Sequence, residues 1–120
     1  MPRVATTPVE LVRNTAVDAK AATVMDAIVQ ASGSEIDVSD INTDKLIIHV
    51  KNTHGSAHDV TIKAGDYSRS SLGDYTFEVA ATTGEAMFVI ESARFKDSDG
   101  KILIDFDAGT TGLIGAYLLP

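Results

Sequence analysis

Apolar and polar side chains alternate with a period of two over much of the chain. Residues 45–53 and residues 58–64 both place apolar side chains at alternate positions. Successive side chains of a β-strand point to opposite faces, so each segment is predicted to be a strand with one face toward a core. The turn-forming residues 54–57 between them predict a local antiparallel hairpin.

A second hairpin is predicted near the C-terminal end. Residues 86–96 begin with an apolar run, and residues 102–107 alternate apolar and polar side chains. The intervening residues 97–100 end in an Asp-Gly step, which readily supplies the positive φ angles of a tight turn. This is the strongest hairpin signal in the sequence.

Two further strands are predicted in the same part of the chain. Residues 75–81 follow a polar loop at 65–74, and they place aromatic and β-branched side chains on one face. The last run, residues 112–119, is mainly apolar and has a strand-like length. The region from residue 45 onward is therefore predicted to consist of strands and turns.

The first third of the chain has a less regular pattern. Residues 17–30 contain enough alanine to form a short helix, but β-branched residues and the break at 32–34 favour a strand. Pro2 and Pro8 disfavour ladder pairing near the N-terminus. The predicted fold is all-β: an antiparallel β-sandwich or jelly-roll-like barrel with an extended N-terminal arm at residues 1–15 and a single β-domain at 16–120.

Composition narrows the class of protein. A chain of 120 residues suits one domain, and with 44% apolar residues it is expected to fold and to be soluble. No apolar run approaches the roughly 20 residues of a membrane span. The net charge of −7 opposes a broad nucleic-acid or anionic-membrane surface, so neither partner is expected. No secretory signal is visible, which makes synthesis in a cytoplasm the expectation.

Carboxylates near the second predicted hairpin suggest two kinds of chemistry, and both have simpler explanations. Asp97 and Asp99 resemble part of a calcium loop, but the twelfth position of such a loop is Ala108 instead of Glu. Asp105 and Asp107 share a strand face and would permit acid–base chemistry. A tight turn and a solvated strand face explain these residues without a ligand or a reaction.

Other catalytic and ligand-binding signatures are absent from the sequence. His49, His54 and His58 lie near the first predicted hairpin, but their spacing matches no zinc motif. The chain has no cysteine and no Gly-x-Ser-x-Gly elbow, and residues 65–73 lack the Gly-Lys-Ser/Thr ending of a phosphate-binding loop. We therefore expect a non-enzymatic protein with no cofactor and no metal.

Two segments are candidates for contact with a partner. Residues 1–8 are expected to extend from the fold as an arm, so that their removal would weaken partner binding and spare stability. An aromatic and a basic side chain in the 65–73 loop are typical anchors of protein interfaces, although an ordinary exposed loop is the simpler interpretation. The candidate partner-binding residues are Arg3, Val4, Pro8, Val9, Tyr67 and Arg69.

Several stretches taken together resemble small virion proteins of tailed phages. They read KLIIHVKNT, HDVTIKAG, LGD, ESARFKDSDG and GLIGAYLLP, and they span about the last two-thirds of the chain. The resemblance implies a capsid decoration, or cement, protein: β-rich, often trimeric, and bound to the major capsid protein on the virion surface. It carries no residue-level binding motif over to this chain.

Two alternatives remain, together with a prediction of self-association. The same architecture suits a head–tail or tail structural subunit, and a carbohydrate-binding module is a further possibility, although the chain has no Trp and three Tyr. A homotrimer is expected from the resemblance and from the apolar C-terminal run, which exceeds the needs of one terminal strand. The residues of this run are Leu113, Ile114, Tyr117, Leu118 and Leu119. They would instead fill the core if the protein were a monomer.

Overall fold

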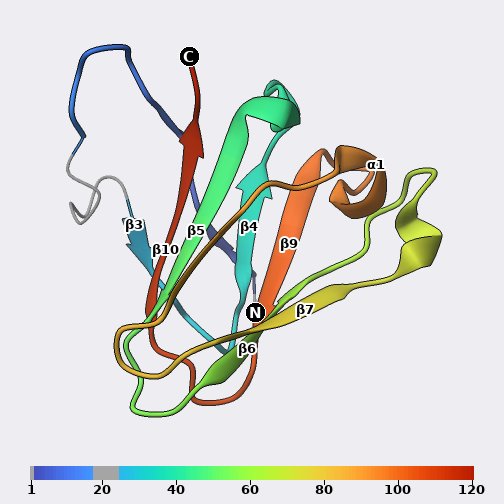
Figure 1. Cartoon of the computed structure of the whole chain (residues 1–120). Coiled ribbons are helices and arrows are strands. Elements are labelled where there is room, and N and C mark those ends of the chain that lie inside the picture. Colours follow the sequence, from blue (N-terminus) through green and yellow to red (C-terminus); the bar gives the residue numbers. More distant parts are fainter. Residues whose placement is uncertain (1, 18–24) are drawn as a thin grey trace.

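Ten strands are the main regular elements of the structure, which is a computed structural model that describes residues 2–17 and 25–120 (Figure 1). The strands form two sheets that pack face to face, which confirms the predicted all-β sandwich. The first sheet, sheet A, has the order β1 (Val4–Ala5), β4 (Ser34–Asp37), β9 (Lys101–Phe106), β6 (His58–Ile62), β7 (Tyr75–Val79).

The second sheet, sheet B, is built around the C-terminal strand. Its order is β2 (Val9–Glu10), β10 (Gly112–Leu118), β5 (Leu46–Asn52), β8 (Glu85–Phe88). A further strand, β3 (Met25–Ala27), pairs with the first part of β10, whereas β2 pairs with its end. Three short helical turns complete the description: η1 (Thr43–Lys45), η2 (Ser70–Leu72) and α1 (Ser92–Phe95).

The core lies between the inner faces of the two sheets. Alternate residues of β5 and β9 are buried, as the period-two pattern predicted. Ile48 and Ile114 of sheet B and Ile36, Ile62 and Ile104 of sheet A have no exposed surface. Full burial of one such side chain contributes about 1.5–3 kcal/mol, so this interior is the main source of stability.

The prediction of a hairpin between residues 45–53 and residues 58–64 is wrong. β5 and β6 follow each other in sequence, but they belong to different sheets, and the connection between them crosses from sheet B to sheet A. The neighbours of β5 are β10 and β8, and those of β6 are β7 and β9. Both strands bury one apolar face. The alternating pattern is satisfied equally well when the two strands lie in facing sheets and pack against the same core, so it does not require them to pair with each other.

Of the second predicted hairpin, between residues 86–96 and residues 102–107, the structure contains only one isolated bridge. β8 ends at Phe88, and the helical turn α1 interrupts the expected strand and buries Phe95. Lys96 and Ile102 form an isolated bridge, while the ladders of β9 are made with β4 and β6. The turn interpretation of 97–100 is confirmed, because the Asp97 carboxylate accepts hydrogen bonds from nearby backbone N–H groups.

The N-terminal segment, residues 2–10, is extended but not free of ladder pairing. β1 runs parallel to β4 and β2 runs parallel to β10, so the segment joins both sheets and makes each of them mixed. The prediction that the prolines prevent such pairing is wrong. Pro2 and Pro8 lie just outside the two strands, where a missing N–H removes no ladder hydrogen bond.

The C-terminal run is buried in part within the fold. β10 is a central strand, and its inward-facing Ile114 and Ala116 belong to the core. Tyr117 is buried with Met25 in a second cluster against which Val9 and other partly buried side chains pack. Leu119 of the same run is 41% exposed, so burial of part of the run does not test self-association, and the homotrimer stays a prediction.

The predicted strand within residues 17–30 is found in part. β3 covers three of these residues, while 18–24 lie outside the described residues. Within the described part of the chain, no helix has the length and apolar character needed to cross a membrane.

Candidate interaction surface

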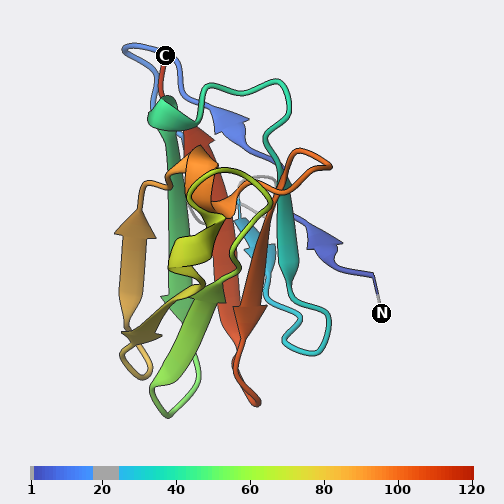
Figure 2. The same cartoon turned by 90° about the vertical axis from the view of Figure 1, so that its right-hand side faces the viewer.

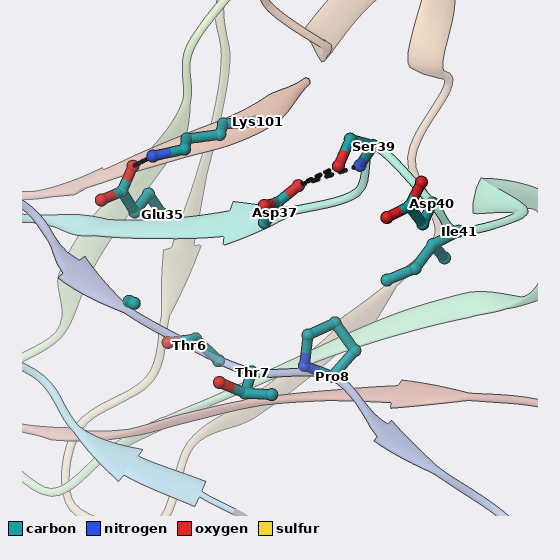
Figure 3. Close-up of a pocket in the computed structure, with 10 residues that line it drawn as sticks. Thr6, Thr7, Pro8, Glu35, Asp37, Ser39, Asp40, Ile41 and Lys101 are labelled. Carbon is teal, nitrogen blue, oxygen red and sulfur yellow. Dashed lines mark hydrogen bonds and ion pairs between the residues drawn. The ribbon is translucent and has the colours of Figure 1, made fainter. Parts of the chain in front are cut away.

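A recess lies where the N-terminal segment crosses from sheet A to sheet B (Figure 3). Its volume is about 370 Å³, and we call it the N-terminal recess. One wall is the N-terminal segment, and the other comprises β4, the loop that follows it and Lys101 of β9. The lining residues are Ala5, Thr6, Thr7, Pro8, Glu35, Asp37, Ser39, Asp40, Ile41 and Lys101.

Local contacts hold the N-terminal segment over this recess. The backbone N–H of Thr6 donates to the Glu35 carbonyl at 2.8 Å. The Arg3 guanidinium donates to the Ile104 carbonyl at 2.9 Å and forms an ion pair with Asp105 at 2.6 Å. These contacts tie the segment to β4 and to β9 at once, so the recess has a defined wall.

The recess carries an excess of negative charge. Lys101 Nζ lies 3.0 Å from Glu35 Oε2, and this contact raises the pKa of Lys101. The hydroxyl and the backbone N–H of Ser39 donate to Asp37 and hold the pKa of that carboxyl below its usual range. Asp40 has no ion pair with any residue that the structure describes. Three carboxylates against one ammonium leave two uncompensated negative charges, so the recess suits a basic group.

The four N-terminal candidates differ in their environments. Pro8 lines the recess. Arg3 is engaged with β9, and the partly buried Val9 packs against the cluster of Met25 and Tyr117. Val4 is half-buried within β1. The side chains of Arg3, Val4 and Val9 are therefore at least partly buried within the fold. Binding of the four residues to a partner stays a prediction.

Tyr67 and Arg69 lie toward the opposite edge of sheet A, next to η2. The Tyr67 side chain is exposed. Arg69 donates from Nε to the Glu91 carboxylate, and its backbone N–H donates to the Ala93 carbonyl. The structure therefore does not bring the two candidate groups together, because β1 and β7 are opposite edges of the sheet.

The three histidines are divided between two places. His54 Nδ1 lies 3.0 Å from His58 Nε2, and His58 Nδ1 lies 2.6 Å from Asp107 Oδ1. His49 instead contacts Glu85 at 2.7 Å. Among the residues placed by the structure, no group of three or more His, Cys, Asp or Glu side chains is arranged to hold a metal ion.

The two carboxylates considered for acid–base chemistry also have separate partners. Asp105 pairs with Arg3 of the N-terminal segment, whereas Asp107 contacts His58 and accepts a hydrogen bond from the Thr110 hydroxyl. They bind different segments of the same chain. Each carboxylate therefore links β9 or the residues just after it to another segment of the fold.

Sequence reasoning missed the carboxylates of the N-terminal recess. Glu35 and Asp37 lie on the outward face of β4, and their alternation with Ser34 and Ile36 is the signal that could have placed them there. The recess itself has no local signal, because it arises from parallel pairing between segments about thirty residues apart.

Comparison with known proteins yields no match to a protein-family model, to a curated protein or to a solved structure.

Proposed function

We propose that this protein is a non-enzymatic virion structural protein of a tailed phage that binds the outer capsid lattice as a decoration protein. The resemblance of five sequence segments supports the class of protein. The observation that carries the mode of binding is the N-terminal recess, which has surplus carboxylates beside the exposed part of the N-terminal segment. A protein that adds contacts to a lattice acts through surfaces of this kind.

The proposed partner is the major capsid protein, and the proposed contact is one of its basic side chains. Lys or Arg entering the recess would meet the carboxylate of Asp40, which has no ion pair among the described residues. Ser39 and Thr7 line the same space and offer hydroxyl groups as hydrogen-bond acceptors. Pro8 stiffens this wall, which lowers the entropic cost of binding.

The same resemblance supports a location on the capsid surface and a homotrimer. The chain would be made in the host cytoplasm and would bind the capsid surface, where three copies staple neighbouring capsid subunits. The net charge of −7 would keep the free protein soluble before assembly.

Co-sedimentation with capsids tests this proposal. The capsids should be assembled from the major capsid protein of the same phage and stripped of decoration protein. Asp40→Lys reverses a charge in the recess, and we expect it to weaken occupancy at least about tenfold. Asp59→Lys makes the same change on β6, two strands away from β4, and should leave occupancy unchanged.

Two outcomes would contradict the proposal. If the unmodified protein does not sediment with capsids, the chain is not a decoration protein. If Asp40→Lys and Asp59→Lys bind equally, the recess is not the contact. Binding confined to the vertex that carries the tail would instead favour a head–tail subunit.

A further inference from the structure

Apolar side chains are exposed along one open side of the sandwich, where β7 and β8 are the edge strands of the two sheets. Two shallow hollows of about 140 and 250 Å³ lie there and share Tyr75. Figure 2 shows β8, in gold-brown, at the left margin of the molecule. We call this surface the edge groove, and its exposed apolar residues are Leu72, Tyr75, Met87 and Val89.

Some backbone N–H and C=O groups of β8 point toward this open side of the sandwich. The N–H of Asn52 donates to the Gly84 carbonyl at 2.9 Å, which makes these two residues a hydrogen-bonded pair. Such pairs alternate along an antiparallel ladder, and Lys51 faces Glu85 in the next position. The N–H and C=O groups of Glu85 and Met87 therefore point away from β5, toward the free edge of sheet B.

Charge is distributed unevenly along the edge groove. Glu85 lies at the end where β8 begins, next to the turn from β7. Arg69 and Arg94 line the hollow at the other end, together with Glu91 and Val89. Arg94 donates to the carbonyls of Gly73 and Asp74, and it forms no ion pair with a carboxylate in the described part of the chain.

One end of the groove carries the Glu85 carboxylate, beside His49 and Lys51 of β5, and the other end carries surplus positive charge. Two arginines against the single carboxylate of Glu91 leave this excess. A two-fold axis reverses the direction of the groove in the second copy. The Glu85 carboxylate of each copy then faces the arginine end of the other copy, which brings opposite charges together at both ends.

We propose that the edge groove binds a second copy of this chain, with the two β8 strands paired antiparallel about a two-fold axis at Met87. In this register Met87 faces the same residue of the second copy, and Glu85 faces the second copy's Val89. Arg69 lines the same hollow as Val89, so Glu85 approaches the second copy's Arg69. The pairing joins the two copies of sheet B and covers apolar side chains on both sides of the axis.

This inference uses a different surface from the proposed capsid contact, and it predicts a dimer in solution in place of the homotrimer that the resemblance implies. The edge groove lies at β7 and β8, whereas the N-terminal recess lies at β1 and β4, across sheet A. A two-fold contact and binding to a capsid can therefore take place on the same molecule. A dimer in solution would be observed whether or not capsids are bound.

Sedimentation of the full chain between about 1 and 100 μM, a range typical of weak protein association, tests the proposal. The unmodified protein should approach a dimer, and Met87→Lys should remain a monomer. Val12→Lys is the matched control, because Val12 and Met87 are both 62% exposed but lie toward opposite edges of sheet B. Circular dichroism of each variant shows that the fold is retained.

A charge exchange tests the two-fold geometry itself. Glu85→Arg places two arginines together at each end of the interface, and Arg69→Glu places two carboxylates together. Each variant should dimerise at least about tenfold more weakly than the unmodified protein. An equimolar mixture of the two variants should dimerise again, because both contacts then join opposite charges.

Three results would overturn the inference. The first is an unmodified protein that stays monomeric at the highest concentration, and the second is a trimer as the associated species. The third is a dimer that responds equally to Met87→Lys and Val12→Lys, or that the mixture of charge variants does not restore. Any of these would show that the edge groove does not pair two copies about Met87.

Discussion

At the scale of single residues, the Asn52 side chain joins separate segments of the chain. It is buried at the end of β5, next to the connection that crosses between the sheets. Its Oδ1 accepts a hydrogen bond from the His54 N–H at 2.9 Å. Its Nδ2 donates to the carbonyls of Ser56, Val79 and Ala80 at 3.0, 3.2 and 3.2 Å.

Replacing Asn52 by Ala should lower the free energy of unfolding by about 3 kcal/mol, because one buried and three partly buried hydrogen bonds to the backbone are lost at once. Thr53→Ala is the control, since Thr53 is exposed and its hydroxyl contacts only the exposed side chain of Thr111 among the described residues. Urea unfolding of the three proteins measures the difference. Equal stability of the two variants would contradict this role for Asn52.

The contacts of the Asp74 carboxylate predict how the free energy of unfolding changes as the pH falls. Its carboxylate accepts a hydrogen bond from the Ala64 backbone N–H at 2.7 Å and pairs with Lys63 at 2.8 Å. The Ala64 N–H, and after it the Lys63 ammonium, lowers the pKa of Asp74 below the ordinary value of 3.8. A lowered pKa means that the contribution is complete above that value and is lost as the pH falls through the folded-state pKa.

Asp74→Asn should therefore be less stable than the unmodified protein at pH 7, and the difference should shrink below about pH 4. Thermal unfolding of both proteins, measured from pH 7 to pH 2, gives this difference in stability. Asp59→Asn, at an exposed aspartate with no ion pair in the described part of the chain, should show no such convergence. A constant difference between Asp74→Asn and the unmodified protein would argue against the assigned contacts.

At the scale of elements, the sequence was sufficient to predict strands but not their partners. The alternation of β5, β6 and β9 was readable because each has one face in the core. Partner choice depends on segments far apart in the chain, and β5 pairs with β10 across about sixty residues. The parallel pairing of β1 with β4 leaves no mark in either local sequence.

Gly112 permits the close approach between β10 and β5. Its φ is +152°, and a Cβ at this position would collide with the backbone carbonyl of Lys51. Gly112→Ala should therefore cost about 2 kcal/mol or more in unfolding free energy. Gly55→Ala is the matched control, because a Cβ there meets nothing within 4 Å. Equal midpoints of chemical unfolding for the two variants would contradict the close approach.

The N-terminal segment should contribute to stability as part of both sheets. Deletion of residues 2–8 removes β1 and the contacts of Arg3 with Ile104 and Asp105. A loss of even 1 kcal/mol would lower the melting temperature by roughly 5 °C in a domain of this size. Arg3→Ala should give part of this effect. An unchanged melting temperature after the deletion would restore the interpretation of a free arm.

At the scale of the whole molecule, the two proposed surfaces lie toward opposite edges of sheet A. The sequence pointed to one residue at each, Pro8 at the N-terminal recess and Arg69 at the edge groove. The carboxylates of the recess and the exposed Met87 and Val89 were not predicted, because their grouping depends on how the sheets are assembled. Charge and hydrophobicity at a surface are properties of the assembled fold.

The central claim is that the chain decorates the outer capsid lattice, and a particle reconstruction tests it most directly. Stripped capsids incubated with the protein should show added density for the sandwich at repeated positions on the outer surface, with the N-terminal recess toward the capsid. The same capsids with Asp40→Lys should show weaker density at these positions. A lattice without added density, or density confined to the tail vertex, would contradict the account.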